Sequence, residues 1–184
     1  MMAHTFDPGS ASSLEDLDRF RYLSRDELVA SLDVQSDSTV ADIGSGTGFY
    51  TREVAPFVGE LYAVDLQDEM HDKFAEHQIP SNVELVLSPA ASLPFDTGTI
   101  DAVFSTMTFH EVSAAAPAEF DRVLGPGGRL VIADWSRAGA GERGPPVGER
   151  TNADGAAKAL EAVGFTIEST SERPETFMLE ATSS

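Results

Sequence analysis

The sequence lacks cysteine entirely and contains few lysines. Without thiols, the chain can form no disulfide bridge, no thiolate metal site and no cysteine nucleophile. Lys73 and Lys158 are the only lysines, and 12 basic residues stand against 31 acidic ones, for a formal net charge of −19. A surface so poor in positive charge cannot neutralise a row of phosphates, so nucleic acids and anionic membranes are not expected as partners.

Long apolar runs are absent as well. A membrane-spanning helix needs about 20 predominantly apolar residues in succession, and residues 1–13 have neither the basic region nor the apolar stretch of a secretory signal. We therefore expect a cytoplasmic protein. The acid-rich, lysine-poor composition is typical of proteins that stay soluble in molar salt, which points to a high-salt-adapted source.

The length and composition suit one globular domain. A chain of 184 residues with 41% apolar residues can bury a sizeable core. We expect a flexible N-terminal tail over residues 1–13, one domain over residues 14–181 that begins with a short helical segment, and a frayed tail over residues 182–184. A homo-oligomer is compatible with the sequence, but no feature indicates one.

Strand-like and helix-like segments alternate along the chain. The predicted strands lie at residues 39–43, 61–64, 83–87, 102–105, 129–133, 165–170 and 177–181. The turn between the last two is too short for a parallel crossover, so this pair should be antiparallel. The pattern predicts an α/β fold with a single Rossmann-like, doubly wound sheet, whose ligand should lie beyond the carboxyl ends of the strands.

Capping patterns predict where two of the helices begin. Ser24 is followed three residues later by Glu27, and Thr151 by Asp154, which are the residue types and spacings of capping boxes. Gly164 stands where the second of these helices should end in a left-handed residue.

The strongest functional signal lies where the first strand turns into a helix. Gly44, Gly46 and Gly48 alternate in VADIGSGTGF, residues 40–49. Alternate glycines allow a tight turn and let the backbone approach a ligand without Cβ clashes, and the N–H groups of the following helix could hold a carboxylate or a phosphate. The spacing fits neither a Walker loop nor the dinucleotide fingerprint, which would need a glycine at Phe49.

A second signal is Asp65, which ends the predicted second strand seventeen residues after Gly48. A carboxylate there could accept hydrogen bonds from both hydroxyls of a ribose, each worth about 1.5–3 kcal/mol. The plain alternative is that Asp65 only caps the next helix, but the glycine turn upstream favours the ribose role.

Four sequence blocks resemble motifs of the class I S-adenosylmethionine-dependent methyltransferases. The blocks lie at residues 40–48, 64–70, 93–103 and 124–130, and the resemblance extends over residues 34–181. Residues 109–112, 134–135 and 144–146 are similar to stretches of the methyltransferase type 11 branch, which includes C-methyltransferases of quinone biosynthesis. The resemblance implies a sheet of seven strands in the order 3-2-1-4-5-7-6, with the seventh antiparallel, and S-adenosylmethionine as cofactor.

The resemblance also assigns cofactor contacts by position. The assigned residues are Asp42, Gly44, Ser45, Gly46, Gly48, Asp65, Leu66, Ala90, Ala91 and Ser105. The three glycines would line the methionine part, Asp42 would hold their loop near the amino group, and Asp65 would bind the ribose. Leu66 would pack on adenine and Ser105 would lie near the sulfonium.

One stretch departs from the family pattern. Many relatives carry Gly-Asp-Ala after the third strand, and that aspartate accepts a hydrogen bond from the adenine amino group. This chain has Ser88, Pro89 and Ala90 there. Backbone groups near Ala90 and Ala91 would therefore have to recognise adenine.

Candidate residues for the methyl acceptor follow the fourth strand and the fifth. His110 is the candidate general base, because an imidazole with a pKa near 6.5 can accept a proton at neutral pH, and Glu111 could orient it or act instead. The alternative is an ordinary loop histidine that bonds the backbone. Met107, Phe109 and Trp135 could form an apolar acceptor pocket, although such residues are often core. No histidine has partners at ligand spacing, so no metal site is expected.

The remaining basic and proline-rich features allow two interpretations each. Arg19, Arg21 and Arg25 form the only basic cluster, which is more simply a solvated face paired with nearby acids than a gate for an anionic acceptor. Residues 136–150 could form a lid stiffened by two prolines or a plain surface loop.

Taken together, the sequence predicts an enzyme that transfers a methyl group to a small, largely apolar or aromatic molecule. The alternative is a non-catalytic module that binds the same cofactor and regulates a partner. A nicotinamide-binding domain is disfavoured by the spacing of the glycines.

Overall fold

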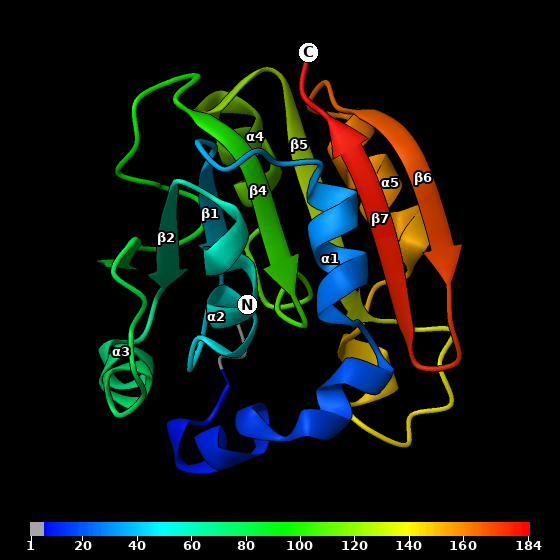
Figure 1. Cartoon of the computed structure of the whole chain (residues 1–184). Helices are drawn as coiled ribbons and strands as arrows, with labels where there is room; N and C mark the ends of the chain where they lie inside the picture. Colours follow the sequence, from blue (N-terminus) through cyan, green and yellow to red (C-terminus); the bar gives the residue numbers. More distant parts are fainter. Residues whose placement is uncertain (1–5) are drawn as a thin grey trace.

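The computed structural model describes residues 6–184 as one sheet with helices on both faces (Figure 1). The strands are β1 (Thr39–Ile43), β2 (Glu60–Asp65), β3 (Val83–Leu87), β4 (Ile100–Thr106), β5 (Leu124–Trp135), β6 (Thr166–Glu172) and β7 (Thr176–Thr182). The α-helices are α1 (Arg25–Leu32), α2 (Phe49–Val54), α3 (Asp68–Ala75), α4 (Ala116–Val123) and α5 (Ala153–Glu161). Short 3-10 helices are η1 (Pro8–Glu15), η2 (Leu17–Arg21), η3 (Ala55–Phe57) and η4 (Val147–Glu149).

The strand order is β3-β2-β1-β4-β5-β7-β6, with β1 to β5 parallel and β7 antiparallel to both of its neighbours. This order confirms the seven-stranded sheet expected from the resemblance. It also confirms that the last two strands form an antiparallel pair. Because the order reverses direction between β1 and β4, loops from these two strands diverge and leave space for a ligand at their carboxyl ends.

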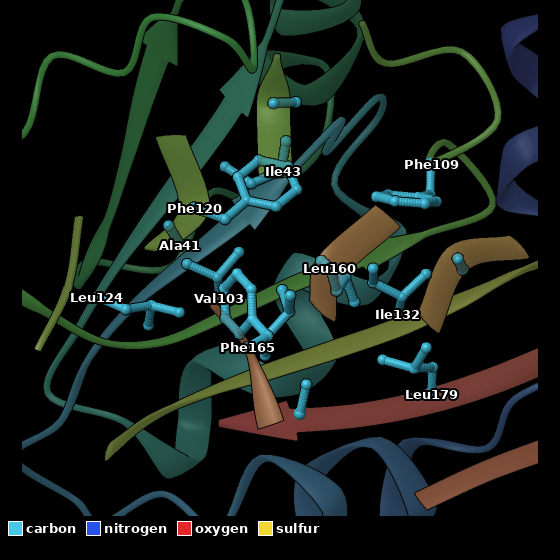
Figure 2. Close-up of a cluster of buried hydrophobic side chains, with 14 of the residues drawn as sticks. Ala41, Ile43, Val103, Phe109, Phe120, Leu124, Ile132, Leu160, Phe165 and Leu179 are labelled. Carbon is cyan, nitrogen blue, oxygen red and sulfur yellow. The ribbon is translucent and has the colours of Figure 1, made fainter. Parts of the chain in front are cut away.

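Two apolar clusters hold the helices on the sheet. One cluster packs α4 and α5 on one face, through side chains such as Phe120, Leu160 and Val103 (Figure 2). The other packs α1 and α2 on the opposite face, with Tyr50 and Leu28 fully buried. The central strands are therefore apolar on both faces, which explains why they read as continuous apolar runs in the sequence.

One of the two predicted helix starts is confirmed, and the other is wrong. Ser24 caps α1, with its Oγ accepting from the Glu27 N–H at 3.2 Å. The start predicted at Thr151 is wrong by one residue, because Asn152 caps α5 and accepts from the Gly155 N–H at 2.9 Å. Thr151 instead forms an isolated bridge with Ser136.

Both ends of the chain are more ordered than predicted where the structure describes them. Residues 1–5 of the predicted tail lie outside the described residues, but the rest of it enters η1, where Ala11 is buried. At the other end, the Ser183 N–H donates to the Gly128 carbonyl at 2.9 Å and its Oγ to the Gly125 carbonyl at 2.6 Å. Strand β5 begins earlier than predicted, at Leu124, and its added residues supply these partners.

No helix among residues 6–184 is both long and apolar enough to cross a bilayer.

Candidate cofactor and acceptor site

A cavity of about 210 Å³ lies at the carboxyl ends of β1, β2 and β4. Its floor is the glycine turn after β1, and its sides are residues 64–67, 88–91 and 106–113. The N-terminal segment, residues 6–21, crosses the same edge of the sheet (Figure 1) and contributes Phe6, Leu14 and Arg19 to the lining. The cavity therefore has a wall that does not belong to the sheet.

The glycine turn is held against β2 by backbone hydrogen bonds. The N–H groups of Gly44 and Ser45 both donate to the Val64 carbonyl, at 2.8 and 3.0 Å. Gly44, Gly46 and Gly48 all have positive φ angles, of 75°, 54° and 77°, which an L side chain rarely adopts. Glycine is therefore required by the turn itself at all three positions.

The three glycines differ in what surrounds them. Gly44 and Gly46 line the cavity, and a Cβ on Gly46 would meet only the Leu14 side chain, at 3.4 Å. Gly48 does not line the cavity, and a Cβ there would overlap the Phe74 ring. Gly48 therefore faces the packing of α3 on the turn, and its contact with the cofactor stays a prediction.

Asp65 joins two walls of the cavity. Its Oδ2 accepts from the Gly46 N–H at 2.8 Å and its Oδ1 from the Gln67 N–H at 2.9 Å. Burial raises the pKa of this carboxyl, and these backbone hydrogen bonds partly oppose the rise. Since each carboxylate oxygen can accept a second hydrogen bond, Asp65 can hold the turn and still accept from a ligand.

Asp42 lies behind the turn and outside the cavity lining. Its Oδ2 accepts from the Thr51 hydroxyl at 2.6 Å, and its Oδ1 has no hydrogen-bond partner among the described residues. Burial raises the pKa of Asp42 to about 7; the charge of Asp65 adds to the rise, whereas Thr51 and Arg19 oppose it. The carboxyl therefore anchors the first turn of α2 to β1, in line with the loop-holding role expected for it.

The side of the cavity assigned to adenine is formed by Leu66 and the loop after β3. Leu66 is 54% exposed and lines the cavity together with Ala90 and Ala91. The Ser88 hydroxyl donates to the Ser92 carbonyl at 2.7 Å, which fixes the shape of this loop without an aspartate. Ser105, by contrast, is fully buried and does not line the cavity, so its place beside the sulfonium stays a prediction.

His110 faces away from this cavity and lines a separate one beside α5. Its Nδ1 lies 2.9 Å from Asp134 Oδ1, and its backbone N–H donates to Asp134 Oδ2 at 2.6 Å. Burial alone would lower the pKa of His110, but its hydrogen bonds to Asp134 and Glu111 outweigh it and raise the pKa to about 9. A ring that is protonated at neutral pH cannot accept a proton, so these surroundings favour Glu111 over His110 for the role of general base.

Glu111, the alternative candidate, does line the cavity. Its Oε1 lies 3.5 Å from His110 Nε2, and its side chain is 19% exposed. The chain of charges Asp134, His110 and Glu111 therefore ends in a carboxylate at the cavity wall.

The predicted apolar acceptor pocket does not form as a unit. Met107 lines the cavity, whereas Phe109 is buried in the core cluster (Figure 2). Trp135 packs on the Tyr22 ring at 5.0 Å and beneath the Arg150 guanidinium. Only the residue nearest the end of β4 reaches the cavity, because the others point to the opposite side of the loop or belong to the next strand.

The sequence did not predict that the N-terminal segment lines the cavity. Glu15 accepts from the Thr47 hydroxyl and from Arg52 Nη2, both at 2.5 Å, and so fastens the N-terminal segment to α2. The Phe6 carbonyl accepts from Gln67 Nε2 at 3.1 Å. Isolated apolar residues at Phe6 and Leu14 in a polar stretch were the available signal.

Within residues 6–184, no three His, Asp or Glu side chains come close enough together to hold a metal ion.

Comparisons with known proteins identify the family and agree with the fold. Residues 41–132 match the family model described as "Methyltransferase domain". Among curated proteins, the chain is 34% identical over 113 residues to the ubiquinone/menaquinone biosynthesis C-methyltransferase UbiE of Marinomonas sp., covering 56% of this chain and 45% of that one. It is 39% identical over 110 residues to the biotin biosynthesis bifunctional protein BioHC of Cellvibrio japonicus, covering 58% of this chain and 22% of that one. The chain thus spans less than half the length of these relatives.

Solved structures match over nearly the whole chain. A SAM-dependent methyltransferase from Aquifex aeolicus has a TM-score of 0.87 and 28% identity, covering 97% of this chain and 99% of that one. The [4+2]-cyclase SpnF has a TM-score of 0.74 and 21% identity, covering 90% of this chain and 80% of that one, which shows a shared fold.

Proposed function

This chain belongs to the methyltransferase domain family, and we propose that it transfers a methyl group from S-adenosylmethionine to a small molecule. The observation that carries the proposal is the cavity in which Gly46 and Asp65 meet, joined by a hydrogen bond of 2.8 Å. A half-buried backbone turn beside a carboxylate suits a nucleoside with a charged tail.

The cavity lining fits this cofactor in residue type. Asp65 offers acceptors for ribose hydroxyls, and Leu66 and Ala90 offer apolar surface for a base. The Ser45 hydroxyl lines the cavity, is buried and has no hydrogen-bond partner among the described residues. Because buried polar atoms are normally hydrogen-bonded, Ser45 is a fitting partner for a polar ligand group.

When bound, S-adenosylmethionine supplies a methyl group on a positively charged sulfur, which transfers by in-line displacement. The contribution of the chain is mainly position, and holding two reactants in line can account for about 7–11 kcal/mol of a barrier. Met107 and Val112 provide apolar walls that do not oppose the dispersal of charge. Glu111 is the candidate for receiving a proton from the acceptor, while the His110 imidazolium holds it in place.

We further propose that the acceptor is small and largely apolar or aromatic. Met107, Val112 and Ile43 give the cavity apolar surface beside Glu111. The printed name of UbiE describes that relative as a C-methyltransferase of quinone biosynthesis, so a hydroxylated aromatic ring methylated at carbon is the first acceptor class to test.

The test combines binding with turnover, in molar salt to suit the acidic composition. Calorimetric titration should show binding of S-adenosylmethionine and none of NAD. Cell extract incubated with the protein and methyl-labelled cofactor should yield a labelled small molecule by mass spectrometry. Binding without any labelled product would favour the regulatory module, and binding of NAD alone would overturn the assignment.

The Glu111→Gln variant distinguishes cofactor binding from methyl transfer. This variant should bind S-adenosylmethionine as tightly as the wild type but label the acceptor at least about tenfold more slowly, if Glu111 takes the proton. Glu149→Gln, which changes an exposed residue at the second cavity, is the matched control. An unchanged rate in Glu111→Gln would remove the proposed role of this carboxylate.

A further inference from the structure

Met107 has a backbone conformation that is unusual for its residue type. Its φ angle is 58°, and the only other non-glycine residue with a positive φ among residues 6–184 is Asp33, at 50°. Asp33 is the C-cap of α1, and a short polar residue tolerates the left-handed conformation there. Met107 follows the last residue of β4 and has a long apolar side chain, so its conformation is strained.

Hydrogen bonds on both sides of Met107 hold this conformation. Its own N–H donates to the Ala133 carbonyl on β5, at 2.7 Å. The hydroxyl of Thr108 lies 3.3 Å from the Gly44 carbonyl, and the Thr108 side chain fills the space that a Cβ on Gly44 would need. The Glu111 N–H then donates to the Thr108 carbonyl at 2.8 Å. A strained residue persists where its surroundings determine its conformation, and such residues cluster at ligand sites.

The left-handed residue changes which residues reach the cavity. Successive side chains of a strand point to opposite faces of the sheet. In β4, Val103 accordingly belongs to the apolar cluster under α4 and α5, and Phe104 to the cluster under α1 and α2. An extended continuation would place Met107 on the same face as Val103. Instead, Thr106 and Met107 both line the cavity although they are consecutive, so the strained backbone directs Met107 to the cavity.

Met107 belongs to the wall that lies away from the base end of the cavity. Asp65 and Leu66, which suit ribose and base, lie at the end of β2. Residues 106–113 lie at the end of β4, and β1 with its glycine turn separates β2 from β4 in the sheet. The same wall carries Glu111, the candidate for receiving a proton from the acceptor. Met107 therefore borders the space in which the acceptor would lie.

Space in this cavity is limited. Pockets for drug-sized ligands commonly have volumes of about 300–1,000 Å³, whereas this cavity of about 210 Å³ would take a nucleoside cofactor and an acceptor together. The methionine side chain is unbranched and can adapt its shape to fill an irregular gap. A single methylene in a hydrophobic pocket changes discrimination between substrates by about 10–200-fold. A whole methionine side chain at the acceptor end therefore has a large effect on which acceptors fit.

We propose that Met107 sets the upper size limit of the acceptor, so that a single aromatic ring fits beside it and a fused two-ring system does not. This inference rests on the proposed function and names the residue that determines its specificity. The strained backbone supports it, because a glycine at this position would relieve the strain but leave the space unfilled.

The test compares two acceptor probes that differ by one ring, hydroquinone and naphthohydroquinone. The wild type should methylate hydroquinone with the higher kcat/KM. In Met107→Ala, the ratio of kcat/KM for the two-ring probe to that for the one-ring probe should rise at least about tenfold. Calorimetry should show wild-type affinity of this variant for S-adenosylhomocysteine, the cofactor without its methyl group, because the turn and Asp65 are unchanged.

A second pair of variants measures the backbone strain separately from the side chain. Met107→Gly and Met107→Ala both lack the thioether, but only glycine adopts a positive φ without cost. Met107→Gly should therefore unfold at a higher denaturant concentration than Met107→Ala, whereas alanine is the more stabilising of the two at ordinary positions. This measurement needs no acceptor.

Two further variants serve as controls. Met107→Leu keeps a side chain of similar volume, so it should keep the low ratio of two-ring to one-ring methylation. Asp33→Gly relieves the other positive φ angle, outside the cavity lining, and should leave this ratio unchanged.

Three results would overturn the proposal. The first is a wild-type ratio in Met107→Ala, and the second is a lower unfolding midpoint for Met107→Gly than for Met107→Ala. The third is a loss of S-adenosylhomocysteine affinity in Met107→Ala that equals its loss of turnover, which would make Met107 a cofactor contact.

The proposed function can fail separately from the size limit. If the wild type labels a small molecule in cell extract but neither probe, the aromatic acceptor class is wrong. Met107→Ala must then label larger molecules than the wild type does, and an identical set of products would overturn the size limit. If the wild type labels nothing, the proposed function fails and the size limit fails with it.

Discussion

Two regions at the carboxyl edge of the sheet differ in how their polar side chains are satisfied. Around the glycine turn, Arg19 Nε, Asp42 Oδ1 and Ser45 Oγ are buried without partners among the described residues. Beside α5, Arg150 and Glu175 are equally buried, but Arg150 donates to three carbonyls and to the Glu175 carboxylate. The contrast supports the proposal that the first region binds a ligand, whereas the second stabilises the scaffold.

The largest expected effect is on the scaffold region. Arg150→Met should lower the free energy of unfolding by about 3–5 kcal/mol, because it leaves the Glu175 carboxylate buried without its cation. Chemical denaturation measures this loss, and calorimetry should show unchanged cofactor affinity in the folded fraction. If Arg150→Met instead lost cofactor affinity while its free energy of unfolding stayed normal, the proposed difference between a ligand-binding region and a scaffold region would be wrong.

The next effect is a pH dependence of stability from His110. Its pKa is raised to about 9 in the folded state, so its protonated form stabilises the fold below its unfolded pKa of about 6.5. This stabilisation should fade as the pH rises from about 6.5 through about 9. The unfolding free energy of the wild type should therefore exceed that of His110→Gln by on the order of 3 kcal/mol at pH 6, and the gap should narrow by pH 9.5.

The matched control is His77→Gln, which changes a ring that is 40% exposed. Its stability should follow the wild type across this range. If the difference in unfolding free energy between the wild type and His110→Gln widened as the pH rose, the ring would be neutral in the folded state. His110 would then be a candidate general base.

The smallest expected effect lies in the ligand-binding region. Asp65→Ala should weaken S-adenosylmethionine at least about tenfold, equal to about 1.4 kcal/mol, because it removes the ribose acceptor and frees the Gly46 N–H. Calorimetry measures the affinity, and denaturation should show a smaller loss of stability than in Arg150→Met. Unchanged affinity would remove the ribose assignment.

The sequence predicted the sheet well because its signals are local. Continuous apolar runs such as residues 39–43 mark buried parallel strands, and the short link before β7 requires an antiparallel pair. The ends of the chain were predicted less well. Their order depends on partners far away in sequence, such as the Gly125 carbonyl that accepts from Ser183.

The candidate site also depends on partners distant in sequence, so it was predicted only in part. The glycine spacing predicted the turn, but which glycine borders the cavity depends on Thr108 and Phe74, which contact Gly44 and Gly48. Likewise, His110 resembles a catalytic base until Asp134, 24 residues later, is seen to hold its ring. Such contacts join residues that are far apart in the sequence, and no local sequence pattern predicts them.

The N-terminal segment has a consequence for the timing of the reaction cycle. Leu14 and Arg19 line the cavity beside the glycine turn, and Glu15 fastens this segment by hydrogen bonds with Thr47 and Arg52. We expect a bound nucleoside to leave the cavity more slowly while these hydrogen bonds are intact. Residues remote from the transferred carbon would then affect the rate of turnover.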